Sequence, residues 1–406
     1  MMYDVMIIGG GAAGLIAACV LSGAGKRVLL LEKQARVGRK LLSTGNGRCN
    51  MTNLKAAPEN YHGSRAAAAK ALKKCGPQAV LSFFEELGIP TVADEEGRVY
   101  PMSNQAASVL DALRLYADEN GCETVTECGV ESLQRTKNGF TARCAEGRSF
   151  QAKRALVCTG GLAAPKLGAC GDGYRMLESL GHASVPKLPA IAALKTPPEL
   201  VRSLKGQRAE CEIALLADGK ILRTEKGEVL FSETGVSGIA SMQLARACSA
   251  AMKAGGRCEV RINFLPGADV FALLCDRAEK LPKRAMEDFL NGVVSKRIGM
   301  ALVKLAGVEM TRAAGTLRTK ELRALAALLG GWTIPVTGVQ GFDQAQVTAG
   351  GISLSDFDWD TMQSKRTPGL YAAGEMLDVD GDCGGLNLQW AWSSALIAAR
   401  AMLEDM

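Results

Sequence analysis

The sequence predicts an α/β protein that opens with a Rossmann-type dinucleotide-binding unit, and three observations support this fold class. The N-terminal segment combines a buried strand over 3–8, a glycine-rich turn, an Ala- and Leu-rich helix over 12–23 and a second buried strand over 27–31. Residues 210–262 contain short alternating apolar runs that are typical of antiparallel strands. Residues 266–328 show the spacing of helices with charged outer faces. We therefore expect a nucleotide-binding domain combined with a β-rich part and a helical part.

Length and composition limit the class of protein. The 406 residues are enough for two or three domains, and the content of 48% apolar and 22% charged residues is typical of packed globular proteins. The net charge of +6 comes without any run of five or more like charges, so we expect no nucleic-acid partner, whereas an anionic small ligand is compatible. No apolar stretch predicts a membrane-spanning helix, and the N-terminus lacks the basic start of a signal peptide. We expect a soluble, cytoplasmic protein that does not associate with a membrane.

Cysteine and histidine usage argues against disulfides and metal sites. The 13 cysteines are odd in number and scattered in spacing, and no CxxC pattern occurs. Most stand in apolar contexts, as Cys19, Cys158 and Cys275 do, which favours buried, reduced thiols. The two histidines, His62 and His182, are far apart and outside the glycine-rich motifs. We therefore expect no metal site and no histidine general base.

The N-terminal turn has the pattern G-x-G-x-x-G at Gly9, Gly11 and Gly14. Gly9 permits the tight turn, Gly11 leaves room for a pyrophosphate, and Gly14 lets the helix pack closely on the strand. The free N–H groups at the helix start face the phosphates. Glu32 ends the second strand, where its carboxylate can accept hydrogen bonds from both ribose hydroxyls and repels an NADP 2′-phosphate. The unit predicts a dinucleotide but does not separate NAD from FAD.

Three later segments favour FAD. The loop over 36–53 combines basic side chains with a Gly-Asn-Gly turn and several amides, so it can wrap a phosphate and offer hydrogen bonds to a heteroaromatic ring. In 155–173 a strand ends in Thr-Gly-Gly, and glycines there let the chain pass beside a nucleotide at the crevice of the sheet. In 369–399 a strand ends in Gly-Glu, and a glycine-rich loop then opens a helix whose positive end suits a pyrimidine ring. Together the segments predict non-covalently bound FAD.

Seven longer motifs, spread over essentially the whole chain, point to one family. They are GGGAAG, GRKLLSTGNGRCNMTN, RVYPMSNQA, CTGG, FSETGVSG, VTAGGI and GLYAAGEMLDVDGDCGGLNLQWAWSSA. With these motifs the sequence resembles the bacterial flavoproteins described as BaiN-like or aminoacetone-oxidase-like FAD-binding enzymes. The resemblance implies a Rossmann-type FAD-binding domain built from both chain ends, a β-rich insert domain and a small helical insert. The expected boundaries are 1–188 and 346–406 for the FAD-binding domain, 189–265 and 329–345 for the β-rich insert, and 266–328 for the helical insert.

The resemblance also implies which residues bind FAD. The N-terminal turn and the following acid bind the ADP half, the basic residues after it approach adenosine and phosphates, and the Thr-Gly-Gly and Gly-Glu turns flank the pyrophosphate. The GNGRCN loop and the C-terminal glycine-rich loop meet the flavin, and one valine contacts adenine. The predicted residues are Gly9, Gly11, Ala12, Ala13, Gly14, Glu32, Lys33, Arg39, Lys40, Asn46, Arg48, Cys49, Asn50, Val130, Thr159, Gly160, Gly161, Gly374, Glu375, Asp382, Cys383, Gly384, Gly385, Asn387, Leu388 and Gln389.

Redox chemistry follows from the cofactor, because FAD itself carries hydride and electrons. Candidates for handling protons or substrate are Arg48, Tyr100, Asp382 and Cys383, and a redox-active thiol at Cys49 or Cys383 stays open. Assignments among the family members include amine oxidation and the reduction of steroid-like enones. We expect an FAD-dependent oxidoreductase that oxidises or reduces a small organic or steroid-like molecule. Since only one full G-x-G-x-x-G occurs, NAD(P)H as reductant must dock transiently.

Two other hypotheses stay open at this point. The first is a flavin-bound redox sensor or RNA-associated accessory protein without turnover, which predicts nucleic-acid binding that weakens with salt. The second is an NAD-linked dehydrogenase, which leaves the two later motifs unexplained. The sequence does not name the substrate, the electron donor or acceptor, or the oligomeric state.

Overall fold

The computed structural model describes residues 2–406, and the chain falls into two units with boundaries at Leu188–Pro189 and Ala345–Gln346. The first unit combines the residues up to Leu188 with Gln346–Met406, and the second is Pro189–Ala345. Each unit has its own sheet. The predicted fold class, a Rossmann-type domain with additional antiparallel sheets, is confirmed.

The central sheet of the first unit joins strands from both ends of the chain. β1 (Tyr3–Ile8) lies between β2 (Val28–Leu31) and β10 (Ser149–Val157) in parallel pairing. β7 (Glu123–Val125) adds in parallel to β2, and β20 (Leu370–Ala372) adds in parallel to β10. The first half of β10 pairs antiparallel with β9 (Gly139–Cys144), which continues to β8 (Val130–Thr136). All of β2 and most of β1 are buried, as expected for apolar runs in a sheet covered on both faces.

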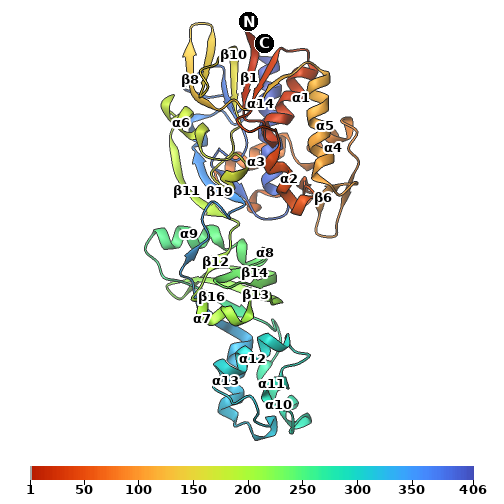
Figure 1. Cartoon of the computed structure of the whole chain (residues 1–406), viewed down its shortest axis with the longest axis vertical. Helices are drawn as coiled ribbons and strands as arrows, with labels where there is room; N and C mark the ends of the chain where they lie inside the picture. The colour runs from red at the N-terminus through yellow and green to blue at the C-terminus, as the bar shows by residue number, and fades with distance from the viewer. Residues whose placement is uncertain (1) are drawn as a thin grey trace. The chain divides into compact units, whose positions relative to one another are not determined.

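Helices α1 (Ala12–Gly23) and α14 (Leu386–Glu404) pack against each other beside this sheet (Figure 1). α1 begins and ends at the residues that the sequence predicts. α14 is buried along most of its length and includes the fully buried Trp392, which explains its weak amphipathic pattern. The other helices of the unit are α2 (Arg39–Ser43), α3 (Arg65–Lys74), α4 (Pro77–Glu86), α5 (Ala106–Glu119) and α6 (Asp172–Ser179).

Small sheets hold the long loops of the first unit. β3 (Thr52–Asn53), β6 (Arg98–Pro101) and β5 (Thr91–Ala93) form an antiparallel sheet next to the GNGRCN loop. β4 (Tyr61–Gly63) pairs antiparallel with β21 (Val379–Gly381), so an N-terminal segment is tied to the C-terminal glycine-rich loop. The proline-rich stretch 186–198 is partly regular: β11 (Ser184–Ala190) pairs with β19 (Val347–Ile352).

The second unit has a seven-stranded antiparallel sheet, and a run of helices is inserted in the sequence between its strands β16 and β17. Its longest pair is β13 (Arg208–Ala217) with β14 (Lys220–Phe231), and β16 (Cys258–Asn263) lies on the other side of β13. The remaining strands are β12 (Leu194–Lys195), β15 (Gly235–Ser237), β17 (Trp332–Pro335) and β18 (Gly338–Val339). The helices are α7 (Pro198–Val201), α8 (Ile239–Met242), α9 (Ala245–Lys253), α10 (Val270–Lys280), α11 (Met286–Phe289), α12 (Lys296–Leu305) and α13 (Thr319–Gly331).

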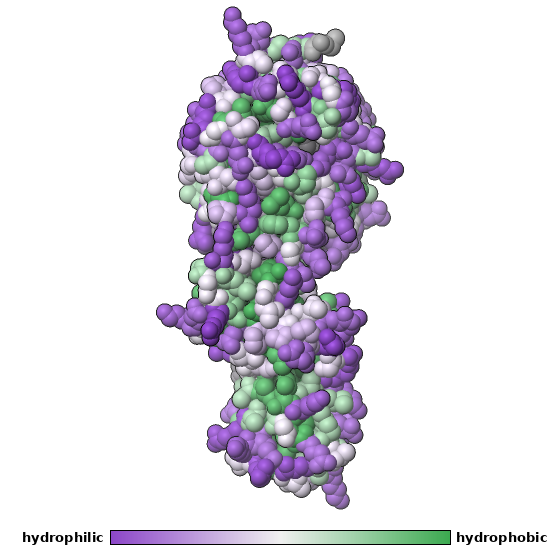
Figure 2. Space-filling view, turned by 60° about the vertical axis from the view of Figure 1, so that its left-hand side comes forward, coloured by the Kyte–Doolittle hydropathy of each residue, from purple (hydrophilic) through white to green (hydrophobic). Residues whose placement is uncertain are grey.

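Hydrophilic and apolar residues are interspersed on the face of the molecule drawn in Figure 2. Figure 2 shows green apolar patches among purple hydrophilic residues on the visible face. Within residues 2–406, no helix combines the length and the apolar character needed to cross a membrane.

Candidate functional site

The turn between β1 and α1 has the packing that the glycine pattern predicts. A Cβ on Gly14 would lie 1.9 Å from the carbonyl oxygen of Gly9, and a Cβ on Gly9 would lie 2.6 Å from that of Cys158. A Cβ on Gly11, in contrast, would meet no described atom within 4 Å. Gly9 and Gly14 therefore serve the packing of strand and helix, whereas the space at Gly11 is open at the helix N-terminus.

Glu32 follows β2 and faces the same turn. One carboxylate oxygen accepts a hydrogen bond from the backbone N–H of Gly10 (2.9 Å), and the other accepts one from that of Gln34 (2.8 Å). Each oxygen keeps a further lone pair, so the carboxylate can also accept from ribose hydroxyls. Glu32 thus has a structural role in addition to the one that the sequence predicts.

The segment that connects β7 to β8 runs beside the end of β2 and brings Val130 near Glu32 and its neighbour Lys33. The backbone N–H of Cys128, in this segment, donates to the carbonyl of Glu32 (2.9 Å). Lys33 forms an ion pair with Asp172 at the start of α6 (2.9 Å) and contacts the Cys170 thiol. Burial opposes the charge of Lys33, but these hydrogen bonds hold its pKa above the ordinary value. Asp172 is a partner that sequence spacing does not reveal.

The GNGRCN loop and the C-terminal glycine-rich loop, which are far apart in sequence, meet in the first unit. The side-chain oxygen of Asn50 accepts a hydrogen bond from the backbone N–H of Gly385 (3.1 Å), at the N-terminus of α14. Asn53 Nδ2 donates to the carbonyl of Gly384 (3.1 Å). A Cβ on Gly385 would lie 2.6 Å from the carbonyl of Thr52, so only glycine allows this approach. The structure therefore brings together two of the three segments that favour FAD in the sequence.

Arg48 and Tyr100 lie next to each other at the edge of this loop. The Arg48 guanidinium stands 4.7 Å from the centre of the Tyr100 ring, a cation–π distance. Cys49 is fully buried, and burial raises the pKa of its thiol to about 12. A thiol in this state is a poor nucleophile, which favours a packing role for Cys49 over a redox role.

Lys40 and Glu375 connect the start of the chain with the strand end after β20. Lys40 Nζ lies 2.5 Å from Glu375 Oε2, and Glu375 Oε1 accepts a hydrogen bond from the backbone N–H of Thr348 (3.0 Å). A Cβ on Gly161 would lie 2.8 Å from the Glu375 carboxylate. A Cβ on Gly374 would lie 3.1 Å from the Cβ atom of Ala13. Both predicted glycine turns thus lie close to the helix N-terminus of α1.

The C-terminal loop contains side chains with different surroundings. Asn387 is bonded within the loop, since its amide pairs with the backbone N–H and carbonyl of Gly381 (2.9 and 2.8 Å). Gln389 is fully buried, and its side chain contacts Thr52 and donates to the carbonyl of Cys75 (3.1 Å). The structure therefore places the Gln389 side chain in the protein interior, whereas Asp382 and Cys383 are half-buried.

His62 lies outside the glycine-rich motifs in the sequence but next to one of them in the structure. The β4–β21 pairing brings its Nε2 to 3.0 Å from Oδ1 of Asp382, in the loop predicted to meet the flavin. The segment around His62 has no apolar run or alternation, so the sequence indicates neither the strand β4 nor its distant partner β21.

The residues present fit an FAD molecule by two observations. The open space at Gly11 has the room that a pyrophosphate needs beside the backbone. Thr159 Oγ1 is buried at the end of β10 and has no hydrogen-bond partner among the described residues. Because a buried hydroxyl without a partner is costly, Thr159 is suited to a ligand oxygen at the same crevice. The available groups suit a dinucleotide: backbone N–H groups that can donate to phosphates, the Glu32 carboxylate that can accept from ribose, and the Thr159 hydroxyl.

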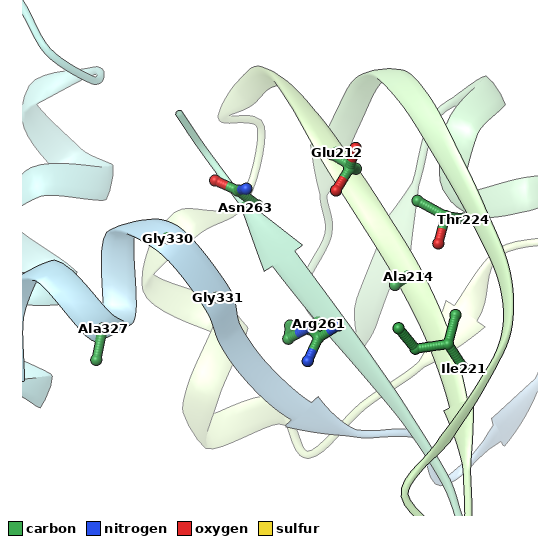
Figure 3. Close-up of a pocket in the computed structure, with 9 residues that line it drawn as sticks. All are labelled: Glu212, Ala214, Ile221, Thr224, Arg261, Asn263, Ala327, Gly330 and Gly331. Atoms are coloured by element: carbon green, nitrogen blue, oxygen red, sulfur yellow. The ribbon is translucent and has the colours of Figure 1, made fainter. Parts of the chain in front are cut away.

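The second unit has a separate, open cavity of about 490 Å³ (Figure 3). Its lining carries the polar side chains of Glu212, Thr224, Arg261 and Asn263 from β13, β14 and β16. It contains none of the residues predicted to bind FAD. The basic residues on the helices of this unit are in part paired, as Lys280 is with Asp276 (2.8 Å).

Comparison with known proteins agrees with this geometry. The chain matches the family model described as HI0933-like protein Rossmann domain over residues 3–401. It is 35% identical to the 3-dehydro-bile acid delta(4,6)-reductase of Clostridium scindens, covering 99% of this chain and 100% of that protein. It is 29% identical to the ribosomal RNA dihydrouridine synthase of Escherichia coli, covering 99% of this chain and 98% of that protein. A solved 3-ketosteroid delta1-dehydrogenase from Sterolibacterium denitrificans has a TM-score of 0.54 at 13% identity, with 100% of both chains covered, which shows a shared fold.

Proposed function

The chain belongs to the HI0933-like Rossmann family, and from this premise we propose that it reduces a carbon–carbon double bond conjugated with a carbonyl group in a steroid-like molecule. The family resemblance seen in the sequence is confirmed, and the protein is an FAD-dependent oxidoreductase. The observation that carries the proposal is the 35% identity, over 99% of the chain, to a reductase of 3-dehydro-bile acids.

The residues that would hold FAD are those that meet around the β1–α1 turn and the α14 N-terminus. Gly11 and the N–H groups of α1 would face the pyrophosphate, Glu32 the ribose, and the loop of Asn50 and Gly385 the flavin ring. When bound, FAD supplies hydride chemistry. The protein must then orient the substrate, exclude water and supply a proton.

The proton is the part of the reaction that the protein's own residues must handle. Saturation of a conjugated double bond adds a hydride at one carbon and a proton at the other. His62 beside Asp382 is suited to deliver that proton, because the carboxylate lies 3.0 Å from its Nε2 and fixes the orientation of the ring. Arg48 and Tyr100, which form a cation–π pair, are the other candidates near the flavin loops.

NADH or NADPH is the proposed electron donor. The sequence has one full G-x-G-x-x-G turn, at Gly9, and that turn is assigned to FAD. The donor would therefore bind transiently, deliver two electrons to the flavin and leave before the substrate binds. This order separates the reaction into two half-reactions that can be measured independently.

A second candidate function is the reduction of uridine in ribosomal RNA. It is favoured by the 29% identity, over 99% of the chain, to a ribosomal RNA dihydrouridine synthase. The chemical step is the same, since dihydrouridine is uridine whose conjugated carbon–carbon double bond has been saturated. The two candidates differ in the size and charge of the substrate, so one experiment separates them.

The test uses the purified holoprotein under anaerobic conditions. NADH or NADPH is first mixed with the protein to bleach the flavin absorbance. The reduced protein is then mixed with a 3-oxo steroid that carries double bonds at positions 4 and 6, or with unmodified ribosomal RNA. Reoxidation by the steroid, with a product heavier by two hydrogens, supports the main proposal. Reoxidation by RNA alone overturns it in favour of the second candidate, and reoxidation by neither contradicts both.

A further inference from the structure

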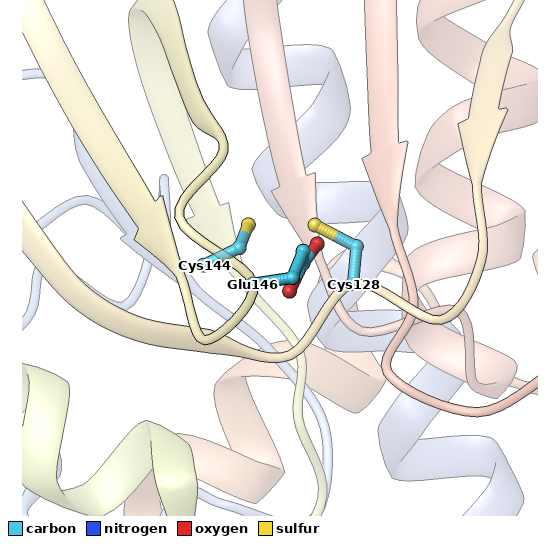
Figure 4. Close-up of side chains that lie close together, drawn as sticks. All are labelled: Cys128, Cys144 and Glu146. Atoms are coloured by element: carbon cyan, nitrogen blue, oxygen red, sulfur yellow. The ribbon is translucent and has the colours of Figure 1, made fainter.

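Two buried cysteines and a glutamate form a compact cluster at one edge of the first unit. The sulfur atoms of Cys128 and Cys144 and a carboxylate oxygen of Glu146 all lie within 4.8 Å of one another. Figure 4 shows the two sulfur atoms on either side of the Glu146 side chain. Both thiols are buried, whereas Glu146 is exposed, so the cluster is open to solvent only through the carboxylate. Among residues 2–406 no other group of three such ligands is found.

Backbone hydrogen bonds hold the three residues in place. Cys128 precedes β8, Cys144 ends β9, and Glu146 lies in the turn before β10. The turn is closed by the N–H of Gly147 donating to the carbonyl of Cys144 (2.9 Å), and it is tied to the Cys128 segment by the N–H of Ala145 donating to the carbonyl of Gly129 (2.9 Å). The ligand atoms therefore come from two segments whose relative position is set by the sheet, and little ordering is needed for all three to bind one ion.

We propose that Cys128, Cys144 and Glu146 bind a thiophilic divalent cation of the Zn²⁺ class, with water as the fourth ligand. Two sulfur ligands favour a soft or borderline cation over Mg²⁺ or Ca²⁺, which prefer oxygen. Zn²⁺ accepts mixed sulfur and oxygen ligands in a tetrahedral arrangement, and three protein ligands plus water is one of its usual sets. The sequence-based expectation of no metal site considered only CxxC and histidine patterns, and this cluster forms across the β8–β9 hairpin.

The Arg148 guanidinium and the protons of the two thiols compete with the cation for its ligands, and the cation can displace both. Arg148 Nη2 lies 2.5 Å from Glu146 Oε1, but both side chains are substantially exposed, and exposed ion pairs contribute little. Thiol groups are protonated at neutral pH and bind a metal ion as thiolates. Binding of the cation therefore releases one proton from each cysteine and frees Arg148 from the carboxylate.

The position of the cluster suggests what a bound ion would do. The N–H of Cys128 donates to the carbonyl of Glu32 (2.9 Å), and the N–H of Glu127 donates to that of Gln34 (3.1 Å). Glu127 has a positive φ of 52°, a conformation that costs energy for a residue other than glycine. A cation on Cys128 would hold this segment against the strand end that carries Glu32. The site would then stabilise the adenosine side of the predicted FAD site.

The experiment is a titration of the metal-free holoprotein, with its thiols reduced, with Co²⁺. Tetrahedral Co²⁺ with thiolate ligands absorbs at wavelengths beyond the flavin bands. We expect one Co²⁺ per chain, displacement of that Co²⁺ by Zn²⁺, and a higher melting temperature in Zn²⁺. Cys128→Ser and Cys144→Ser should abolish the bands, and Glu146→Gln should weaken binding about 10-fold or more. The circular dichroism spectrum of each variant shows that it is folded.

The matched control is the second pair of neighbouring cysteines, Cys248 and Cys258. Cys258 Sγ lies 3.9 Å from the carbonyl of Cys248, and this pair belongs to no three-ligand group among the described residues. Cys248→Ser should leave the Co²⁺ bands unchanged. The proposal is overturned if the wild-type protein shows no such bands, if they persist in Cys128→Ser and Cys144→Ser, or if Cys248→Ser removes them. None of these outcomes depends on the proposed reductase activity.

Discussion

The imidazole Nε2 of His62 lies 3.0 Å from the carboxylate Oδ1 of Asp382, although 320 positions separate the two residues. The pairing of β4 with β21 produces this contact. Each side chain is 19% exposed, so a proton can exchange with solvent while the carboxylate fixes the orientation of the ring. The pair lies at the loop predicted to meet the flavin, which makes it the proposed source of the substrate proton.

Replacement of His62 by Asn should separate the two half-reactions. We expect reduction of the flavin by NAD(P)H to be retained, because it needs no proton from His62. Reduction of the conjugated substrate should slow by about 10²–10⁴-fold, the usual contribution of a positioned acid. Asp382→Asn should have the same effect in smaller degree. Stopped-flow absorbance of each half-reaction measures both rates.

The control for this prediction is Lys70→Met, which removes an exposed ion pair with Asp360 elsewhere in the first unit. It should change neither rate. An unchanged rate of substrate reduction in His62→Asn would remove His62 from the mechanism, whereas loss of FAD from that variant would indicate a structural role only.

Gly14→Ala should destabilise the apoprotein, whereas Gly11→Ala should leave its stability unchanged. Gly11 has φ −83°, which alanine adopts without strain, and its Cβ would meet no described atom. The apoprotein should therefore keep its melting temperature, while FAD affinity falls by about 1–3 kcal/mol because the methyl group takes space expected for the pyrophosphate. Gly14→Ala should destabilise the apoprotein itself, since the Cβ would lie 1.9 Å from the Gly9 carbonyl oxygen. Calorimetry of both apoproteins and FAD titration measure the difference.

Alkylation should distinguish the cysteines by burial. Cys170 is exposed, whereas Cys49 is fully buried and its thiol pKa is raised to about 12. Iodoacetamide at neutral pH should modify Cys170 in the folded protein and reach Cys49 only after unfolding. Peptide mass spectrometry gives the site of modification, with Cys170→Ser as the control. Rapid modification of Cys49 in the native protein would restore a redox role for that thiol.

His182 should make the folded state sensitive to acid. Its ring is buried, with Nδ1 3.0 Å from the carbonyl of Leu177 and Nε2 2.7 Å from Ser364 Oγ. Burial lowers its pKa in the folded state below the ordinary 6.5, so the unfolded chain binds a proton first as the pH falls. The associated stability is fully present above about pH 6.5 and decreases below it, by at most about 1.4 kcal/mol per pH unit.

The measurement is the free energy of unfolding of the wild type and of His182→Gln between neutral and mildly acidic pH. The difference in free energy between the two proteins should shrink as the pH falls. A difference that does not depend on pH would show that His182 takes up its proton equally in both states.

Local elements of this fold could be predicted from the sequence, but contacts between distant segments could not. Helix 12–23 was predicted to the residue, because its apolar pattern and its glycine turn are both local signals. The pairing of His62 with Asp382 depends on the register of two three-residue strands, which carry no periodic pattern. The interior position of the Gln389 side chain, bonded to Cys75, likewise has no signal in the glycine-rich motif around it. Motifs identified the loops of the site, and only tertiary structure shows which side chains face them.

The placement of β20 and α14 has a consequence during synthesis of the protein. β20 completes the parallel sheet beside β10, and α14 packs against α1, yet both follow the whole second unit in the chain. A ribosome therefore translates about half of the chain after β10 before these elements exist. Until then the turn at Gly11 has no α14 beside it, and the loop of Asn50 has no Gly385 to contact. The predicted FAD site is therefore complete only after these elements are synthesised, and we expect FAD supply to control how much of the protein survives proteolysis.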